Sequence, residues 1–412
     1  STSRANGGYR EDLLYVFNHQ ACEPSGHGGG KAMMGYTDPD RYQADVCARH
    51  GIGPPSRCAS LSTAANMRLC DVKSESYKDL TVVAVATAGV ESNAGRAGDP
   101  ASGYEGRDGY EAIPRWRKAH AEAHRLPSAE PGPEASGGES AGTAGEGRSG
   151  PGDAGDPAAP DDGPSGPPPH GTINTLVFMN LPLTPGCLAR VIMTATEAKT
   201  AVLQELNINS RYSDGLATGT GTDQIAAAAL FVEGFPALSS AGKHSKLGEL
   251  IGVTVKGAVR GALLRQNSLS PDRQCSVKIL TERLFEKEGV FRSTRDEVAE
   301  LFSASMDPET AELFRCNSKA ALCDPATVAA CAAMMHLRDQ FAWGTLPPLL
   351  WPEIMSSQAA LLAAAAGGDF SRTGSYRERL GDLSPDRTRE GFIRLVGKAL
   401  AMGYSDKWEK GV

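Results

Sequence analysis

The feature that most restricts how this chain can fold is a long stretch of low complexity before its midpoint. Residues 125–170 are rich in Gly, Pro, Ala, Ser and acidic residues and contain no Phe, Trp or Tyr. Such a segment cannot bury enough apolar surface to offset the conformational entropy lost on ordering. We therefore expect a disordered insertion, over about residues 100–170, within a domain that continues on both sides of it. A solvated loop is the favoured interpretation, and a tether is the alternative.

Charge and cysteine content limit the classes of function. The net charge is −7, and residues 125–170 account for −6 of it with eight acidic residues and two Arg, so the remainder carries −1. The negative sign is weak evidence against a nucleic-acid partner, and the near-neutral remainder indicates no partner by charge. Nine cysteines without a Cys-x-x-Cys pair are typical of a reducing setting, so we expect a cytoplasmic protein. No apolar run reaches the roughly 18 residues of a membrane span, and we expect no signal peptide.

Apolar runs on both sides of the insertion predict a central sheet flanked by helices, in an α/β or α+β fold. The β-branched run at residues 80–86 is typical of a central strand, and shorter runs predict strands at residues 13–17 and 176–179. Helices are expected at residues 38–50, 187–206 and 246–265, with a modest one at residues 104–124. Residues 225–235 form a further apolar segment.

The last third of the chain has a helical pattern. Apolar residues recur at a spacing of three to four in residues 275–288, 295–303, 326–341, 356–366 and 392–402. We expect a domain boundary near Asn267, which separates residues 1–267 from a helical domain of residues 268–412. The sequence indicates no role for this second domain.

The first motif with chemical potential is Thr194-Ala-Thr-Glu197-Ala-Lys199. On a helix, Thr194 and Glu197 share a face, whereas Glu197 and Lys199 do not. A carboxylate beside hydroxyl groups is suited to act as a general base for the attack of water. The same Thr-x-x-Glu spacing is also that of a capping box, which the spacing alone favours.

The second motif, Thr218-Gly-Thr220-Gly-Thr222-Asp223, alternates Gly with Thr, so amides and hydroxyls are presented along one loop. Such a loop can bind an oxyanion, a phosphate or an amide. The ordinary alternative for Asp223 is the N-cap of a following helix. His244 in the next polar loop and Glu249 are candidates for proton transfer, although a lone loop histidine is more often a surface residue. Metal binding by His244, Glu249 and Asp223 is a further alternative, but their spacing matches no zinc signature.

Two further features have a chemical and an ordinary interpretation. Cleavage before Thr172, in Gly171-Thr172, would create a threonine whose α-amine serves as base for its hydroxyl, as in a self-processing amidohydrolase. A Gly-Thr pair that merely opens a strand is the more common case. Cys316, Cys323 and Cys331 with His336 suggest a metal, but their spacing fits buried small residues better.

Several blocks, taken together, resemble the adenosylcobinamide amidohydrolase (CbiZ) family. In chain order they are Asn6-Gly-Gly-Tyr-Arg10 with Asn18, Leu61-Ser-Thr-Ala-Ala-Asn66, Thr87-Ala-Gly-Val-Glu-Ser-Asn93-Ala, Arg96-Ala-Gly-Asp99-Pro, Gly171-Thr-Ile-Asn174, Thr194-Ala-Thr-Glu197-Ala-Lys199, Thr218-Gly-Thr-Gly-Thr-Asp223, Gly242-Lys-His244 and Leu247-Gly-Glu249-Leu-Ile-Gly. The resemblance covers residues 1–265 without the insertion, which falls between two blocks that the family joins almost directly. Nothing in residues 267–412 belongs to it.

The resemblance implies hydrolysis of the amide between the aminopropanol arm of adenosylcobinamide and a propionate of its corrin ring, which releases adenosylcobyric acid in corrinoid salvage. It implies positions, and residue type suggests the roles. The candidate proton-transfer groups are Glu197, Asp223, His244 and Glu249. The candidate substrate-binding residues are Asn6, Arg10, Asn66, Asn93, Arg96, Asn174, Lys199, Thr218, Thr220, Thr222 and Lys243.

Among the binding candidates, Lys199, Asn93 and Asn174 are suited to donate to an oxyanion or an amide, whereas Arg10, Arg96 or Lys243 is suited to meet a phosphate. No metal or cofactor bound by the protein itself is expected, because the cobalt arrives with the corrinoid. Two alternatives stay open: a non-catalytic corrinoid carrier or sensor, and the self-processing threonine amidohydrolase. The sequence does not indicate an oligomeric state.

Overall fold

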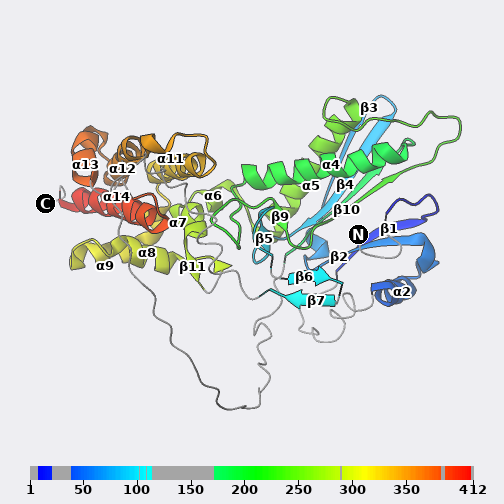
Figure 1. Cartoon of the computed structure of the whole chain (residues 1–412), viewed down its shortest axis with the longest axis horizontal. Coiled ribbons are helices and arrows are strands. Elements are labelled where there is room, and N and C mark those ends of the chain that lie inside the picture. Colours follow the sequence, from blue (N-terminus) through cyan, green and yellow to red (C-terminus); the bar gives the residue numbers. More distant parts are fainter. Residues whose placement is uncertain are drawn as a thin grey trace, which may run out of the picture.

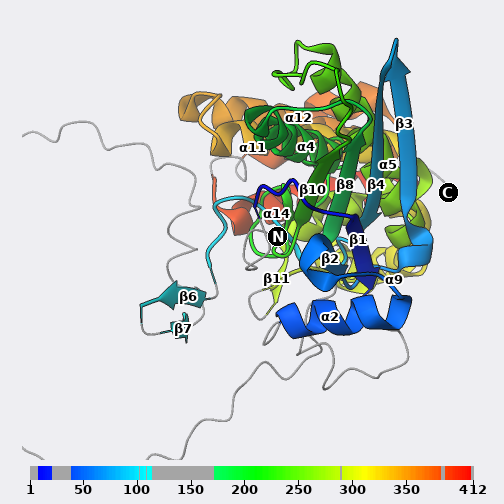
Figure 2. The same ribbon diagram turned by 90° about the vertical axis from the view of Figure 1, so that its right-hand side faces the viewer.

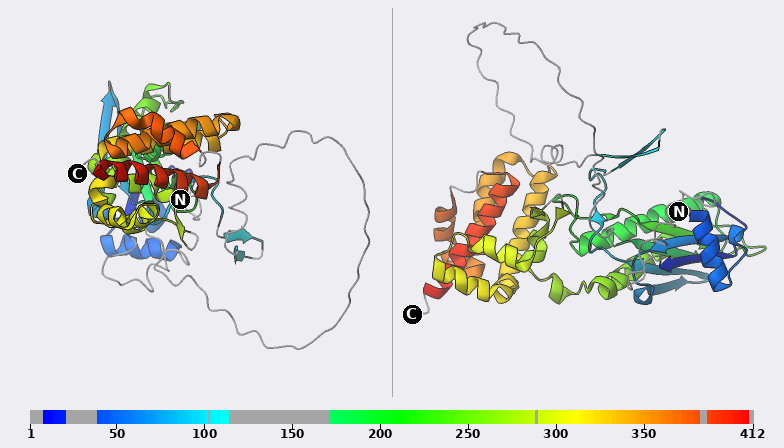
Figure 3. Two further views of the ribbon diagram at one scale, coloured as in Figure 1. Left: turned by 90° about the vertical axis from the view of Figure 1, so that its left-hand side faces the viewer. Right: turned by 90° about the horizontal axis from the view of Figure 1, so that it is seen from below.

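The computed structural model describes residues 8–20, 39–101, 103–107, 109–113, 171–287, 290–381 and 386–409. Most of the expected insertion, residues 114–170, lies outside these ranges, and so does Asn6. The elements before residue 268 and the helices that follow them lie one after the other along the long axis of the molecule (Figures 1 and 3). The expected fold class, a sheet flanked by helices with a helical C-terminal region, is confirmed.

The centre of the first region is a four-stranded sheet with the strand order β10-β8-β4-β3. The strands are β3 (Asp71–Tyr77), β4 (Leu80–Ala88), β8 (Ile173–Met179) and β10 (Gln224–Ala229). Strands β8 and β10 are parallel, and the other two pairs are antiparallel. The central strand expected at residues 80–86 is confirmed, whereas β3 was not predicted because its sequence is mostly polar and its residues are largely exposed.

Two long helices, α4 (Pro185–Glu205) and α5 (Lys246–Asn267), pack against the sheet and against each other (Figures 1 and 2). Their apolar faces form one core with alternate residues of β4, such as Val82 and Ala84. Helix α4 begins at Pro185, where Thr184 accepts a hydrogen bond from the amide of Cys187. Thr194 therefore lies inside the helix, and the interpretation of Thr194 and Glu197 as a capping box is wrong.

The order of the strands brings residues from distant parts of the sequence together at one end of the sheet. Since β8 and β10 are parallel neighbours, the chain must return between them, and α4 makes this crossover. The first residues of β8 and β10 therefore lie beside the last residues of β4: Asn174 is paired with Gln224 on one side and with Thr87 on the other. The C-terminal end of α5 reaches the same place, where Asn267 accepts a hydrogen bond from the amide of Val90. We call this the site end of the sheet.

Smaller elements surround the site end. A parallel pair, β1 (Tyr15–Gln20) and β2 (Cys58–Thr63), lies near it with helix α2 (Pro39–His50) (Figure 2). Strand β5 (Ala94–Gly95) pairs with β9 (Gly219–Thr220). Strands β6 (Gly103–Gly106) and β7 (Gly109–Ala112) form a hairpin. The helix expected from residue 104 is therefore wrong over this hairpin, where Gly103, Gly106 and Gly109 disfavour a helix.

The C-terminal region has its own core, built from residues between Val277 and Tyr404. Its helices are α6 (Pro271–Gln274), α7 (Val277–Thr281), α8 (Arg295–Ser303), α9 (Pro308–Cys316), α10 (Ser318–Leu322), α11 (Pro325–Ala342), α12 (Trp351–Gly367), α13 (Thr373–Leu380) and α14 (Arg389–Glu409), and β11 (Glu286–Lys287) pairs with β12 (Val290–Phe291). The helices expected at residues 295–303 and 326–341 are confirmed. That this region is a domain of its own stays a prediction.

Candidate functional site

Most of the buried polar candidates gather at the site end of the sheet. They come from the turn after β4, the start of β8, the inner face of α4 and the loop before β10. We call this group the sheet-end cluster, and its members are Asn93, Thr172, Asn174, Lys199, Thr220, Thr222 and Asp223.

The centre of the cluster is an ion pair between Lys199 and Asp223, whose side chains are only 8% and 11% exposed. The Asp223 carboxylate also accepts hydrogen bonds from the amides of Ile173 (2.9 Å) and Thr220 (3.0 Å) and from the Thr220 hydroxyl. It thus ties α4, the loop and β8 together. Because residues 224–229 form a strand, the N-cap interpretation of Asp223 is wrong. A lysine ammonium has three N–H donors, so Lys199 keeps donors beyond the one it gives to Asp223.

A second part of the cluster surrounds the peptide group between Gly171 and Thr172. The Gly171 carbonyl accepts hydrogen bonds from Asn93 Nδ2 at 3.1 Å and from Thr222 Oγ1 at 3.2 Å. The hydroxyls of Thr172 and Thr222 are 2.6 Å apart. Asn93 is itself held by the Tyr212 hydroxyl, which donates to its Oδ1 at 2.8 Å. Hydroxyl and amide groups thus converge on one carbonyl.

Asn174 lies deeper, at the boundary between the sheet and the β1–β2 pair. Its side chain is fully buried, and its Nδ2 donates to Asn18 Oδ1 at 2.8 Å and to the carbonyl of Ser62 at 2.9 Å. Asn18 in turn donates to the Thr87 hydroxyl at 2.8 Å. Asn174 Oδ1 has no hydrogen-bond partner among the described residues. Asn174 connects three strands, and its unpaired oxygen is an acceptor facing the interior.

The glycines of the loop allow it to pack over the ion pair. A Cβ on Gly219 would collide with the Asp223 carboxylate and lie 2.8 Å from Lys199 Nζ. Gly221 is exposed and lies beside Asn93, so the cluster meets solvent at this point of the loop. The Thr218 hydroxyl accepts a hydrogen bond from the backbone amide of Ala97 at 2.8 Å. A ligand that approaches along the loop thus meets backbone and hydroxyl groups above a buried charge pair.

Three other binding candidates form hydrogen bonds with other groups of the protein. Asn66 caps a short 3₁₀ turn by accepting from the amide of Arg68 at 3.0 Å. The Arg96 guanidinium donates to the carbonyl of Leu216 at 3.1 Å. Arg10 pairs with Asp12 at 2.5 Å on the surface of the N-terminal segment. Their contacts are those of residues that hold loops, and substrate binding by them stays a prediction.

The remaining candidates lie elsewhere, in what we call the surface group: Glu197, Lys243, His244 and Glu249. All four are exposed. Glu197 pairs with Lys243 at 2.9 Å, and this hydrogen bond lowers the pKa of the Glu197 carboxyl. Glu249 pairs with Lys246 at 2.6 Å.

The length of α5 keeps two members of the surface group away from the sheet-end cluster. His244 and Glu249 lie at the N-terminal end of this helix, whereas its last residue, Asn267, binds the turn beside Asn93. The helix has 22 residues, which corresponds to a length of about 33 Å. The structure therefore does not bring His244 and Glu249 together with Asp223, and a catalytic role for them stays a prediction.

Tyr212, which contacts the sheet-end cluster, was not among the candidates that the sequence suggested. It lies in a loop between α4 and β9 that has no periodic pattern, and only the fold places its hydroxyl against Asn93. Burial raises the pKa of the Tyr212 phenol, and the nearby Asp99 carboxylate adds to the effect, so the phenol stays a hydrogen-bond donor near neutral pH.

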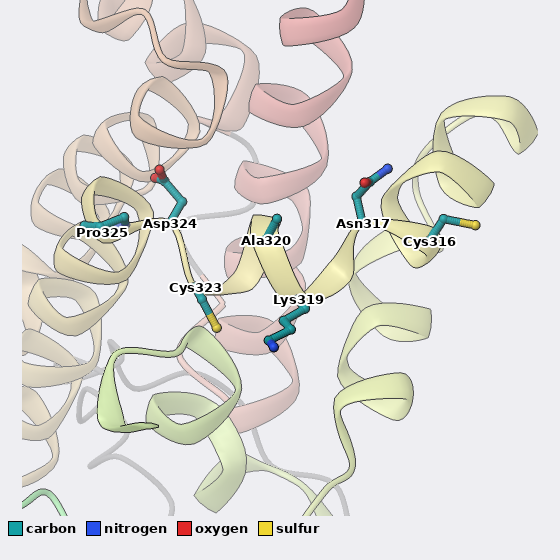
Figure 4. A pocket seen from close by; sticks show the side chains of 7 residues that line it. All are labelled: Cys316, Asn317, Lys319, Ala320, Cys323, Asp324 and Pro325. Carbon is teal, nitrogen blue, oxygen red and sulfur yellow. The ribbon is translucent and has the colours of Figure 1, made fainter. Parts of the chain in front are cut away.

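The cysteine-rich part of the helical region does not assemble a metal site. A shallow hollow there is lined by residues from Cys316 to Pro325. Cys316 is the last residue of α9, Cys323 directly follows α10, and their side chains lie apart (Figure 4). Cys331 is fully buried, which raises the pKa of its thiol to about 12. In the part of the chain that the structure describes, no three His, Cys, Asp or Glu residues are placed to hold a metal ion.

The comparisons with known proteins concern the first two thirds of the chain. A family model for adenosylcobinamide amidohydrolase matches residues 1–271. An uncharacterized protein of Methanocaldococcus jannaschii is 31% identical over 264 residues, which is 64% of this chain and 81% of that protein. No solved structure matches the chain. Within the described ranges, no helix combines the length and hydrophobicity needed to cross a bilayer.

Proposed function

The chain belongs to the adenosylcobinamide amidohydrolase family, and we propose that it hydrolyses the aminopropanol amide of adenosylcobinamide to give adenosylcobyric acid. The observation that carries the proposal is the buried Lys199–Asp223 pair beneath the Thr218 to Asp223 loop, inside the region that the family model matches.

Amide hydrolysis sets three chemical requirements. Water must add to the amide carbon, the negative charge on the carbonyl oxygen must be stabilised, and the leaving amine must gain a proton. A positive charge in a site that excludes water stabilises an oxyanion strongly because the local dielectric is low. We assign this role to Lys199, whose side chain is only 8% exposed.

Asp223 is assigned to hold Lys199. Its carboxylate accepts four hydrogen bonds, from Lys199, Thr220 and Ile173, and these contacts fix it against the Lys199 ammonium. Asn93 and Thr222 are assigned to orient the substrate amide. The cobalt and the corrin amides are parts of the substrate, and none of the roles assigned to these residues depends on them.

The test uses the purified chain and adenosylcobinamide, with chromatographic detection of adenosylcobyric acid and aminopropanol. The two products should appear in equal amounts. A pair of variants on one helix discriminates between the two groups of candidates. Lys199→Met should abolish turnover, and Glu197→Gln, two residues away on the exposed face, should retain it. The opposite result would place catalysis at the surface group. Tight binding of the corrinoid without products would instead support a carrier or sensor.

A second candidate, the self-processing threonine amidohydrolase, is favoured by one observation. The Gly171 carbonyl has two donors, and Thr222 Oγ1 connects this oxygen with the hydroxyl of Thr172. In such a reaction Thr172 Oγ attacks the Gly171 carbonyl carbon, and its proton passes through Thr222 to the carbonyl oxygen. The C–N bond then breaks with proton transfer to nitrogen, and water hydrolyses the resulting ester to free the Thr172 amine.

The mass of the intact chain tests this second candidate. Two fragments separated at Thr172, which are absent in Thr172→Ala and restored in Thr172→Ser, would establish self-cleavage. A single mass of 43.2 kDa after prolonged incubation would exclude it and leave the first proposal untouched.

A further inference from the structure

The loop that supports the sheet-end cluster is held from its other side by the helical region. We call residues 206–218, between α4 and β9, the site loop. It reaches the cluster through Tyr212, which donates to Asn93. The Ser210 hydroxyl also donates to Asp99 Oδ2 at 2.7 Å, outside the cluster. The backbone of the site loop also binds β5, since the amide of Arg211 donates to the carbonyl of Ala94 at 2.8 Å.

The opposite side of the site loop is bound by residues beyond Asn267. Gln274 donates to the carbonyl of Leu206 at 2.6 Å, and Asn209 Nδ2 donates to the carbonyl of Ile279 at 2.7 Å. A further ion pair joins Arg211 to Glu282 at 3.0 Å. The helical region thus contacts the loop near its start and along its middle.

A further contact is a group of four charges, of which three are buried and Asp214 is 17% exposed. Arg283 forms a two-pronged pair with Asp339, at 2.9 and 2.6 Å, and also donates to the carbonyl of Asp214. Arg338 pairs with the carboxylate of Asp214 and lies 3.6 Å from Asp339. The two arginines and Asp339 are at most 5% exposed. Asp214 in the site loop supplies the second negative charge, so the group is neutral only when the loop is in place.

The balance of charges in this group favours the conformation in which the site loop contacts the helical region. A buried charge is tolerated when it is paired, and removing one partner leaves the other uncompensated. If the site loop moved away, Arg338 would lose its principal partner inside the protein. The helical region therefore favours the loop conformation in which Tyr212 meets Asn93.

We propose that the helical region is a positioning element for the catalytic centre and acts through the chain Arg338–Asp214–Tyr212–Asn93. The proposal rests on the proposed function for its kinetic consequences only. Asp214 and Arg338 are positioning residues, since both act on the cluster through Tyr212. The role of the C-terminal region, which the family model does not cover beyond residue 271, is then to hold the site loop.

The test combines kinetics with hydrogen exchange on the full chain. Asp214→Asn keeps the shape of the side chain and removes its charge. We expect kcat with adenosylcobinamide to fall between about 10- and 100-fold, because a misplaced group near the reacting atoms costs that much. A double-mutant cycle with Tyr212→Phe should show that the second change adds little to the first, since both act on Asn93.

Hydrogen exchange gives a readout that does not depend on turnover. In Asp214→Asn, the amides of Arg211, Ala217 and Thr218, which are hydrogen-bonded to backbone carbonyls, should exchange about tenfold faster. Unchanged exchange would overturn the proposal even if the protein is active. Faster exchange in a protein without activity toward adenosylcobinamide would uphold the anchoring and reject the proposed function.

Asp406→Asn is the matched control. Asp406 is 5% exposed and pairs with Arg372 at 2.6 Å and Arg379 at 3.2 Å inside the helical region. Both partners belong to the helical region and not to the site loop, so Asp406→Asn should destabilise this region and leave kcat and loop exchange unchanged. If it lowers kcat as much as Asp214→Asn does, or if the effects of Asp214→Asn and Tyr212→Phe multiply, the helical region acts only through general stability, and the proposal fails.

Discussion

Replacement of Lys199 by Met tests the physical basis of the site most directly. Met fills a similar volume and removes the ammonium, so the Asp223 carboxylate stays buried without its ion-pair partner. Breaking a buried pair by removing one partner destabilises a protein by roughly 3–5 kcal/mol. Asp223 keeps three donors, from Ile173 and Thr220, and each hydrogen bond to a charged group contributes about 1.5–3 kcal/mol. We therefore expect a loss of about 3 kcal/mol, at the lower end of the range.

Urea unfolding, followed with a probe of the first region, measures this loss. The double variant Lys199→Met with Asp223→Asn should recover part of it, because no unpaired charge then remains buried. Glu197→Gln is the control on the same helix, and its exposed pair with Lys243 should leave the urea midpoint unchanged. If Lys199→Met unfolds at the wild-type midpoint, or if Asp223→Asn adds fully to its effect, the pair is not a coupled buried unit, and the reasoning is refuted.

Three further predictions follow from the geometry around the site. In Gly219→Ala the added Cβ collides with the Asp223 carboxylate, so turnover should fall as far as in Lys199→Met, which a rate assay checks. Gly171 has a φ of +150°, and a Cβ there would lie 2.9 Å from the carbonyl of Gly89, so Gly171→Ala should lower the urea midpoint. Burial raises the pKa of Tyr212 above 10.0. Its contribution to stability is therefore complete below that pH and is lost as the pH rises through the folded-state pKa, so Tyr212→Phe should flatten the fall in stability above pH 10.0.

The secondary structure was largely readable from local patterns. The β-branched run that became β4 and the apolar repeat that became α5 need no distant partner to be recognised, because the period of apolar residues reflects the geometry of the element. The hairpin at Gly103–Ala112 was missed because its residues do not show the alternating apolar pattern of a strand. Its aromatic and acidic residues are compatible with a helix, and only its glycines indicated otherwise.

The sequence identified individual candidate residues of the site, but it did not indicate which of them lie together in the fold. Helix geometry alone places Glu197 and Lys199 on different faces of α4, but it does not say which face is buried. The crossover between β8 and β10 turns Lys199 toward Asp223 and leaves Glu197 at the surface. In the same way, His244 and Glu249 belong to the same ordered series of blocks as the other candidates, and the length of α5 separates them from the sheet-end cluster.

The sequence by itself determined which elements form and which residue types are available for amide chemistry, because both depend on local composition and spacing. Only the tertiary structure decided which of those residues meet. The meeting of Asn93, Thr172, Lys199 and Asp223 depends on strand order, since one end of the sheet collects the end of β4 and the starts of β8 and β10. The ion pair between Arg338 and Asp214 of the site loop likewise depends on packing between regions distant in sequence. Neither relation leaves a periodic signal in the chain.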